Sequence, residues 1–232
     1  MNVRRLTIAI PVFNEERRVE AALKEVLDTT FPVDVEIIVV DDGSTDRTRA
    51  ILSSMSLPGH VRVIEHPENR GKGAALRTAL AEAAGDVFVP FDADLEYAPN
   101  DLRLLLTPLI DGEADVVFGT RAFGSHTAFN YWFVVGNRVL TTWTNILFNC
   151  YLSDMETCFK MARTDVLRSL DLRSDGFDIE PEVTAKILRA GYRPFEIAIQ
   201  YKARTREEGK KITWRDGLRA LWIVARIRFV GR

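Results

Sequence analysis

Short, continuous apolar runs alternate with amphipathic stretches through about the first 120 residues of the chain. Apolar runs of this length are typical of strands that are covered on both faces of a parallel sheet. They predict strands at residues 6–10, 35–40, 61–65, 87–91 and 115–118, and we expect Pro11 to close the first. Right-handed crossovers between such strands predict an α/β fold, with a doubly wound, mostly parallel sheet and helices on both faces.

The amphipathic stretches carry apolar residues three and four positions apart, which is the spacing of one helix face. They predict helices at residues 16–28, 72–84 and 99–109, and a shorter helix through residues 47–52. Ser44 or Thr45 can cap the short helix, and Gly85 fits the C-terminal end of the helix at 72–84.

The regular alternation ends after Arg121. Residues 180–190 look helical and residues 195–201 strand-like, whereas 129–149 is an apolar and aromatic segment. Because no internal repeat or low-complexity linker interrupts the chain, we expect a single domain that spans residues 1–232.

The composition is that of an ordinary globular protein, with 232 residues, 47% of them hydrophobic and 28% charged. A net charge of −2 gives no reason to expect nucleic-acid binding. The three histidines and two cysteines show no zinc-binding spacing. No apolar run approaches the ~20 residues of a membrane span and no secretory signal is visible, so we expect a cytoplasmic protein. Peripheral attachment to the cytoplasmic face of a membrane stays open.

Carboxylates follow two of the predicted strands. Asp92-Ala93-Asp94 comes directly after the strand at 87–91, and Asp41-Asp42 follows the strand at 35–40. Ligands of open α/β sheets bind outside the carboxyl ends of the strands, and carboxylates are the hard oxygen ligands that Mg²⁺ and Mn²⁺ prefer. The sequence therefore predicts one acidic site that binds a nucleotide diphosphate through a divalent cation.

Three motifs together resemble those of a known family, namely Pro11-Val12-Phe13-Asn14-Glu15, Asp41-Asp42-Gly43-Ser44-Thr45-Asp46 and Asp92-Ala93-Asp94. In this order and at these strand ends they look like the inverting GT-A glycosyltransferases of the dolichyl-phosphate mannose synthase-like group. The resemblance covers most of the chain and is strongest over residues 6–121. It implies the GT-A nucleotide-diphospho-sugar transferase fold, with a nucleotide-binding half at 1–121 and an acceptor-binding half at 122–232.

The resemblance also implies an activity. A hexosyltransferase of this group moves a hexose from a nucleotide-diphosphate sugar to a polyprenyl phosphate of the dolichyl or undecaprenyl type. Its divalent cation, Mg²⁺ or Mn²⁺, would be held by Asp92 and Asp94 against the diphosphate. Asp94, Arg121 and Asp154 would act in catalysis, with Arg121 near the phosphates and Asp154 near the acceptor.

The remaining implied roles concern substrate binding. The residues that would line the donor pocket are Pro11, Phe13, Glu15, Val40, Asp42, Asp92, Ala93, Glu96 and Arg121. Among them, Asp42 would accept a hydrogen bond from the base. Arg204 and Lys210 match a late basic pair that closes over the diphosphate.

Each local motif also has a simpler interpretation. Asp41 and Asp42 could cap the following helix, and Glu15 could be a favourable first-turn helix charge. The segment 69–73 lacks the spacing of a Walker phosphate loop and is interpreted first as a turn into a helix, although it also resembles the equivalent loop of the family. The acidic segment at 154–157 could be a solvated loop. If it does lie near the acceptor, Asp154 is the preferred candidate for that contact, ahead of Glu156.

Two alternatives for the function stay open. A saccharide or protein hydroxyl could be the acceptor, and this version needs a catalytic base, for which Asp154 is the best candidate. The chain could also be a nucleotide-sugar-binding subunit without turnover, although its intact Asp92 and Asp94 argue against that.

The C-terminal segment at 212–229 combines an apolar helical face with several arginines. It could pack on the domain, or it could lie on an anionic membrane surface and bring the site to a lipid phosphate. Trp132, Trp143 and Trp214 could likewise be packing residues or belong to such a surface.

Overall fold

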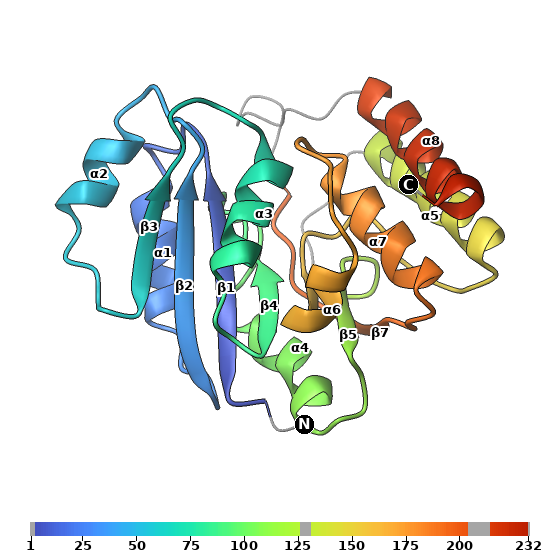
Figure 1. The fold of residues 1–232 in the computed structure, drawn as a ribbon, viewed down its shortest axis with the longest axis horizontal. Coiled ribbons are helices and arrows are strands. Elements are labelled where there is room, and N and C mark those ends of the chain that lie inside the picture. Colours follow the sequence, from blue (N-terminus) through green and yellow to red (C-terminus); the bar gives the residue numbers. More distant parts are fainter. Residues whose placement is uncertain (1–2, 126–130, 204–213, 232) are drawn as a thin grey trace.

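The computed structural model describes residues 3–125, 131–203 and 214–231, apart from the side chains of Trp214 and Arg215. Its strands are β1 (Arg5–Val12), β2 (Asp34–Asp41), β3 (Val61–Glu65), β4 (Val87–Pro90), β5 (Val116–Thr120), β6 (Lys160–Arg163) and β7 (Phe195–Ala198). They form one seven-stranded sheet in the order β3-β2-β1-β4-β6-β5-β7 (Figure 1). The sheet takes strands from both predicted halves of the chain, and the division at residue 121 stays a prediction.

The sheet is mostly parallel, as predicted. β1 pairs in parallel with β2 and with β4, and β5 pairs in parallel with β7. The exception is β6, which lies antiparallel between β4 and β5. Because β2 and β3 lie on one side of β1 and β4 lies on the other, the strand order reverses at β1. Such a reversal is where ligands bind in doubly wound folds, outside the carboxyl ends of the strands.

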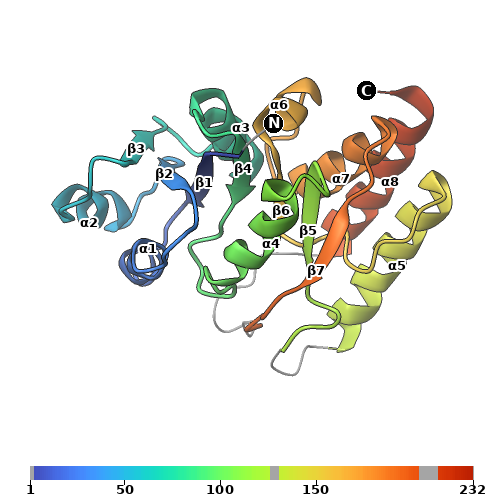
Figure 2. The same ribbon diagram turned by 90° about the horizontal axis from the view of Figure 1, so that it is seen from below.

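The helices are α1 (Val19–Leu27), α2 (Thr48–Ser54), α3 (Lys72–Glu82), α4 (Asp101–Ile110), α5 (Tyr131–Phe148), α6 (Thr164–Ser169), α7 (Ile179–Arg189) and α8 (Trp214–Val230). α1 and α4 cover one face of the sheet, and α3, α6 and α7 cover the other (Figure 2). α5 and α8 lie side by side at the end of the molecule far from β3 and pack on α7.

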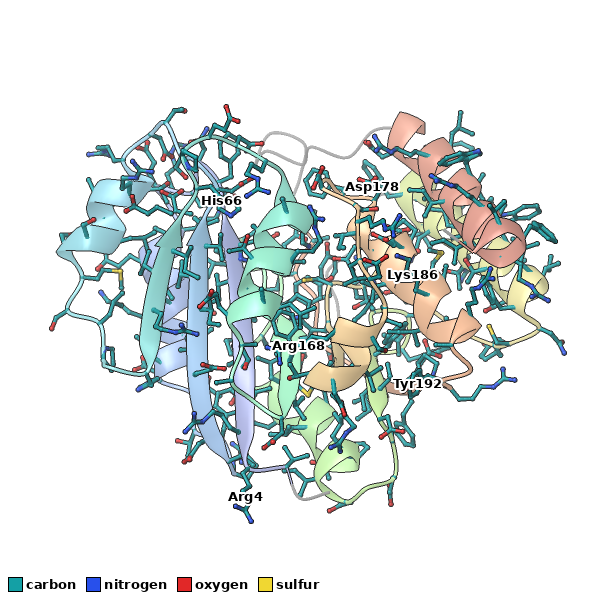
Figure 3. The ribbon with its side chains drawn as sticks, in the orientation of Figure 1. Arg4, His66, Arg168, Asp178, Lys186 and Tyr192 are labelled. Atoms are coloured by element: carbon teal, nitrogen blue, oxygen red, sulfur yellow. The ribbon has the colours of Figure 1, made fainter. Side chains whose placement is uncertain are left out.

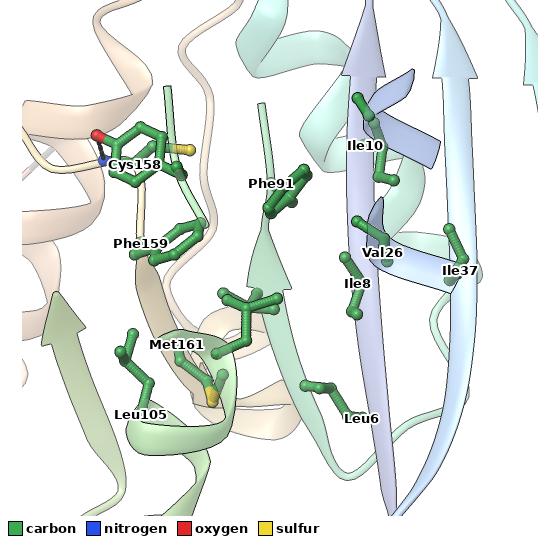
Figure 4. Packing of buried hydrophobic residues seen from close by; sticks show 14 of the residues in the cluster. Leu6, Ile8, Ile10, Val26, Ile37, Phe91, Leu105, Cys158, Phe159 and Met161 are labelled. Carbon is green, nitrogen blue, oxygen red and sulfur yellow. Dashed lines mark hydrogen bonds between the residues drawn. The ribbon is translucent and has the colours of Figure 1, made fainter. Parts of the chain in front are cut away.

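Side chains of β1 show why the apolar runs are continuous. Leu6, Ile8 and Ile10 are buried in the cluster under α1 and α4 (Figure 4), whereas Ala9 belongs to the cluster under α3, α6 and α7. Both faces of the strand are therefore covered, so residues on either face are mostly apolar and the apolar run is continuous.

Pro11 does not close the first strand, because β1 continues through it to Val12. Pro11 is in register with Val40 of β2, while the pairing of β1 with β4 ends at Ala9. A proline is tolerated in this position because β1 has a partner strand on one side only.

Three expected helix boundaries differ from the structure. Residues 16–18 form a turn, so α1 begins at Val19. Neither Ser44 nor Thr45 caps α2; Asp46 accepts the amide of Thr48 at 2.9 Å instead. Gly85 is not the cap of α3, which ends at Glu82.

Two elements have no counterpart in the sequence prediction. β6 has four residues and begins with a lysine, and α6 has six residues, so neither carries a full apolar period. α5 occupies most of the segment that the sequence marked only as apolar and aromatic.

The start of α3 packs closely on a loop of the second half. A Cβ atom added to Gly73 would lie 2.9 Å from the carbonyl carbon of Ser174, and the amide of Ala74 donates to the carbonyl oxygen of Asp175 at 3.1 Å.

We expect Gly73→Ala to lower the free energy of unfolding by about 1–3 kcal/mol, as overpacking does. The matched control is Gly136→Ala on α5, where no atom lies within 4 Å of an added Cβ. The control should be stabilised by about 0.5–1 kcal/mol. Urea unfolding measures both, and equal effects would contradict this packing.

Candidate functional site

The predicted site residues follow strands that end at one edge of the sheet. Asp42 follows β2, Asp92 and Asp94 follow β4, and Arg121 follows β5. β2, β4 and β5 are parallel to one another, so their carboxyl ends share this edge. Figure 3 shows His66, which follows β3, at the same edge.

Asp42 is buried, with 2% of its surface exposed, and its carboxylate organises the loop before α3. Oδ1 accepts hydrogen bonds from His66 Nδ1 at 2.6 Å and from the amide of Arg70 at 3.0 Å. Oδ2 accepts the amide of Gly71 at 2.7 Å, just before α3 begins. Asp42 therefore does not cap α2, and its predicted contact with the base stays a prediction.

A chain of alternating charges lies under the end of β4. Lys72, the first residue of α3, is 2.9 Å from the carboxylate of Asp92 and 3.1 Å from that of Glu180 on α7. Glu180 is also 2.6 Å from Lys160 of β6. Burial raises the pKa of Glu180, but the charges of Lys160 and Lys72 outweigh it and hold this pKa below its usual value. The acid is thereby kept ionised.

Asp94 lies in the turn after β4. Its Oδ1 accepts the amide of Glu96 at 3.0 Å, and Leu95 between them has a positive φ of 63°. Glu96 is buried and its carboxylate contacts the hydroxyl of Tyr201. This turn fixes the backbone around Asp94.

The donor set fits a hard divalent cation. The carboxylate of Asp92 is 23% exposed, and that of Asp94 is one residue away along the chain. Within the described ranges, no three His, Cys, Asp or Glu residues form a complete metal site. Mg²⁺ is commonly bound by one or two carboxylates together with substrate phosphates, and two carboxylates suit that arrangement.

Arg121 and Asp154 form a buried, bidentate ion pair. Arg121 donates from Nε to Oδ2 at 2.6 Å and from Nη2 to Oδ1 at 2.8 Å, and Asn137 of α5 donates to the same carboxylate at 2.9 Å. Burial raises the pKa of Asp154, but the charge and hydrogen bonds of Arg121, with the bond from Asn137, lower it to about 2. The pair joins the end of β5 to α5.

Glu156 has the opposite character. Burial raises its pKa to about 7, against the opposing charge of Lys160 and together with the like charge of Glu180. Its Oε1 is buried and has no hydrogen-bond partner among the described residues. Of the two acids, Glu156 has the pKa nearer to neutral pH, and the predicted role of Asp154 near the acceptor stays a prediction.

The other predicted residues are partly explained by the fold. The peptide carbonyl of Glu15 starts the turn before α1, and its side chain is 3.3 Å from Arg18. Val40 and Ala93 are buried, and Pro11 and Phe13 are partly exposed at the end of β1. Arg204 and Lys210 lie outside the described residues. The substrate-binding roles of all these residues stay predictions.

Sequence reasoning missed four polar residues of this edge: His66, Lys72, Lys160 and Glu180. Lys72 falls in the segment that reads as a turn into a helix, and Glu180 in a first helical turn. For His66 and Lys72 the available signal was position, since His66 directly follows a predicted strand and Lys72 begins the next predicted helix.

Comparison with known proteins identifies the family. The model of glycosyl transferase family 2 matches residues 7–171, which is more than two thirds of the chain. The chain belongs to glycosyl transferase family 2. The family predicted from the motifs at three strand ends is thus confirmed.

Two relatives of this family 2 glycosyltransferase support the narrower group. A dolichol-phosphate mannosyltransferase of Pyrococcus furiosus is 27% identical over 220 residues, which are 90% of this chain and 60% of that protein. The chain therefore spans less than two thirds of that relative. A polyprenol monophosphomannose synthase of Mycolicibacterium smegmatis is 28% identical over 86% of this chain and 78% of its own length.

The solved structures confirm the predicted GT-A type of fold. Glucosyl-3-phosphoglycerate synthase from Mycobacterium tuberculosis, in complex with Mn²⁺, uridine diphosphate and glucosyl-3-phosphoglycerate, superimposes with a TM-score of 0.71. The match covers 97% of this family 2 glycosyltransferase and 80% of that chain, at 22% identity. Another structure of that synthase contains Mg²⁺ and uridine diphosphate.

The ion pair of Asp154 predicts a pH-dependent stability. The pKa of Asp154 is about 2 in the fold against 3.8 for the free group, so the pair stabilises the protein above pH ~4 by about 2 kcal/mol. This contribution is lost as the pH falls from ~4 to ~2. Asp154→Asn should therefore show a shallower loss of stability between pH 5 and pH 3 in urea unfolding.

The control for this prediction is Asp171→Asn, which removes the exposed partner of Arg173. We expect only a small change from the control, because an exposed ion pair contributes little. Asp154→Asn should also be less stable at pH 7, by about 3–5 kcal/mol, since it leaves Arg121 buried without its counter-charge. An unchanged pH dependence would contradict the assigned ionisation.

Proposed function

We propose that this protein is a metal-dependent, inverting glycosyltransferase that moves a hexose from a nucleotide-diphosphate sugar to a polyprenyl phosphate. The supporting relatives are named for dolichol phosphate and polyprenol acceptors and match most of the chain. The neighbouring structures hold Mn²⁺ or Mg²⁺ with uridine diphosphate, which supports the donor class and the cofactor.

One observation favours a phosphate acceptor over a hydroxyl. A hydroxyl acceptor needs a base, and Asp154, which would serve, has a pKa of about 2 and accepts hydrogen bonds from Arg121 and Asn137. A carboxylate this acidic is a weak base. A phosphate monoester is already ionised near pH 7, because its second pKa is about 6, and requires cations more than a base.

The residues at the carboxyl ends of the strands would have different roles in the reaction. Asp92 and Asp94 would hold the cation, which when bound neutralises the charge that develops on the leaving diphosphate. Lys72 orients the carboxylate of Asp92 through their ion pair. Arg121 uses Nε and Nη2 for Asp154, so Nη1 is the nitrogen that could face an acceptor phosphate. Asp42 keeps the loop before α3 in place beside the nucleotide.

A saccharide or protein hydroxyl is the second candidate acceptor. Its specific support is Glu156, whose pKa of about 7 suits a general base. In this version Glu156 replaces Asp154 as the basic group.

The proposal includes contact with the cytoplasmic face of a membrane through α5 and α8. Their outer surface exposes Trp132, Ile146, Trp222 and Phe229, and a groove of about 500 Å³ between them is lined by Val139, Trp143, Ile146 and Leu221, with Arg138 beside these. α8 also packs inward through Ile223, Val224 and Ile227. In the part of the chain that the structure describes, no helix meets the length and apolarity of a membrane span. An apolar surface with arginines suits the headgroup region of an anionic leaflet.

The first test is a donor-by-acceptor panel. We expect transfer from a UDP- or GDP-hexose to a polyprenyl phosphate in the presence of Mg²⁺ or Mn²⁺, and loss of turnover in EDTA. Asp94→Asn should lower kcat by about 100-fold or more, because it removes charge stabilisation of a few kcal/mol in the transition state. Glu113→Asn, an exposed carboxylate in the loop before β5 at the opposite edge of the sheet, is the control and should leave kcat near that of the wild type. Full activity in EDTA, or transfer only to hydroxyl acceptors, would refute the proposal.

The second test addresses the membrane. The wild type should co-sediment with vesicles that contain anionic lipid, and binding should weaken as salt is raised. The double variant Ile146→Ser/Trp222→Ser should bind less, because about 2–3 kcal/mol of apolar burial is lost for each large side chain. Leu104→Ser on α4 removes a side chain that is 52% exposed elsewhere and should bind like the wild type. Equal binding of all three proteins would exclude the α5–α8 surface.

A further inference from the structure

Glu156 lies between the two charged systems of the site. It belongs to the segment that leads into β6, and because β6 is antiparallel to β4 and β5, that segment lies at the edge where β4 and β5 end. Arg121 and Asp154 form one of these systems, and Lys160 and Glu180 belong to the other; all four charges affect the ionisation of Glu156.

The cations around Glu156 are already bound by other carboxylates. Lys160 donates to Glu180 at 2.6 Å, and Arg121 makes its bidentate contact with Asp154. The Oε1 of Glu156 is buried without a hydrogen-bond partner among residues 3–125, 131–203 and 214–231, although the side chain as a whole is partly exposed. A buried polar group without a partner is destabilising, and in native proteins it calls for an explanation.

The position of Glu156 limits what the missing partner can be. The proposed cation and diphosphate lie at Asp92, and the proposed acceptor phosphate lies at Arg121. In an inverting displacement the leaving and attacking oxygens lie on opposite sides of the anomeric carbon, so the hexose must lie between these two groups. The charge chain from Asp92 through Lys72 and Glu180 to Lys160 runs through the same region and ends beside Glu156.

Hexose hydroxyls match this need. Each can donate and accept a hydrogen bond, so a hydroxyl can pair with a carboxyl group in either protonation state. A site built to hydrogen-bond a substrate hydroxyl discriminates strongly against analogues that lack it, because its own buried group is then left unpaired.

We propose that Glu156 binds a hydroxyl of the transferred hexose and helps to determine which hexose the enzyme accepts. This inference rests on the proposed function for the donor class, but not on the acceptor. Glu156 is thus a specificity-determining residue for the hexose, whereas Asp92 and Asp94 serve the cation and the diphosphate.

The test is calorimetric binding without an acceptor. UDP, UDP-glucose, GDP and GDP-mannose are titrated in the presence of Mg²⁺ into the wild type, Glu156→Ala and Glu156→Gln. For the nucleotide that binds, we expect unchanged affinity for the diphosphate alone in all three proteins. The extra affinity that the hexose adds should fall by about 10-fold in Glu156→Ala and by less in Glu156→Gln, which keeps hydrogen-bonding atoms.

Deoxy analogues of the bound nucleotide sugar identify the hydroxyl. The analogue that lacks the contacted hydroxyl should bind the wild type and Glu156→Ala with equal affinity, whereas the other analogues should still distinguish them. Glu113→Ala, which removes an exposed carboxylate from the opposite edge of the sheet, should keep the full hexose contribution. Equal hexose contributions in the wild type and Glu156→Ala would overturn the inference.

Other outcomes separate this inference from the proposed function. If Glu156→Ala loses turnover with a hydroxyl acceptor but binds the nucleotide sugar normally, Glu156 is the acceptor base and the inference fails. If the hexose contribution is lost but no polyprenyl phosphate is glycosylated, the inference stands and the proposed acceptor is wrong.

A stability measurement excludes a purely structural role. The pKa of Glu156 is about 7 in the fold against 4.5 for the free group, so the fold becomes less stable as the pH rises from 4.5 to 7. Glu156→Gln removes this effect, and its unfolding temperature should exceed that of the wild type at pH 8 and match it near pH 4.5. A lower unfolding temperature at pH 8 would indicate a structural carboxylate and contradict the inference.

Discussion

The pairing of Lys72 with Asp92 and Glu180 is the interaction on which the candidate site at the carboxyl ends of the strands depends. Buried charges are costly unless each has an opposite partner, and here the pairs join elements that are distant in sequence. Lys72 begins α3, Asp92 follows β4, Glu180 is on α7 and Lys160 begins β6. None of these elements can shift alone without leaving a charge unpaired. The position of Asp92, one of the two carboxylates that would hold the cation, therefore depends on its ion pair with Lys72.

Much of the fold and half of the site follow from local sequence. The parallel strands β1 to β5 are apolar runs, and Asp42, Asp92 and Arg121 are recognisable because each comes directly after one. β6 could not be predicted, since it is short and begins with Lys160. The charge of that buried lysine is balanced by Glu180, twenty residues later, which accepts a hydrogen bond from its ammonium group. No periodicity encodes such a long-range pair.

The chemical character of the acidic residues depended even more on tertiary structure. Asp154 and Glu156 are two residues apart and both carry a carboxyl group. The pKa of Asp154 is nevertheless about 2, whereas that of Glu156 is about 7. The difference arises because Arg121 and Asn137 reach Asp154, while Glu156 is buried without such donors. Likewise, the sequence left open whether Asp42 caps the following helix, and in the fold its carboxylate accepts the amides of Arg70 and Gly71.

The junction between β4 and β6 has a consequence for how this protein could evolve. The two strands pair only through Val87 with Arg163 and Phe88 with Ala162, at the start of β4. Beyond Phe88 they are connected through the ion pairs of Lys72 and Lys160 with Asp92 and Glu180. Substitution of any one of these charged residues leaves a buried partner without its counter-charge, which is strongly destabilising. Glu156 is the exception, because its removal breaks no hydrogen bond within the described fold. If Glu156 binds the hexose as proposed, donor preference can therefore change through position 156 while the neighbouring ion pairs stay intact.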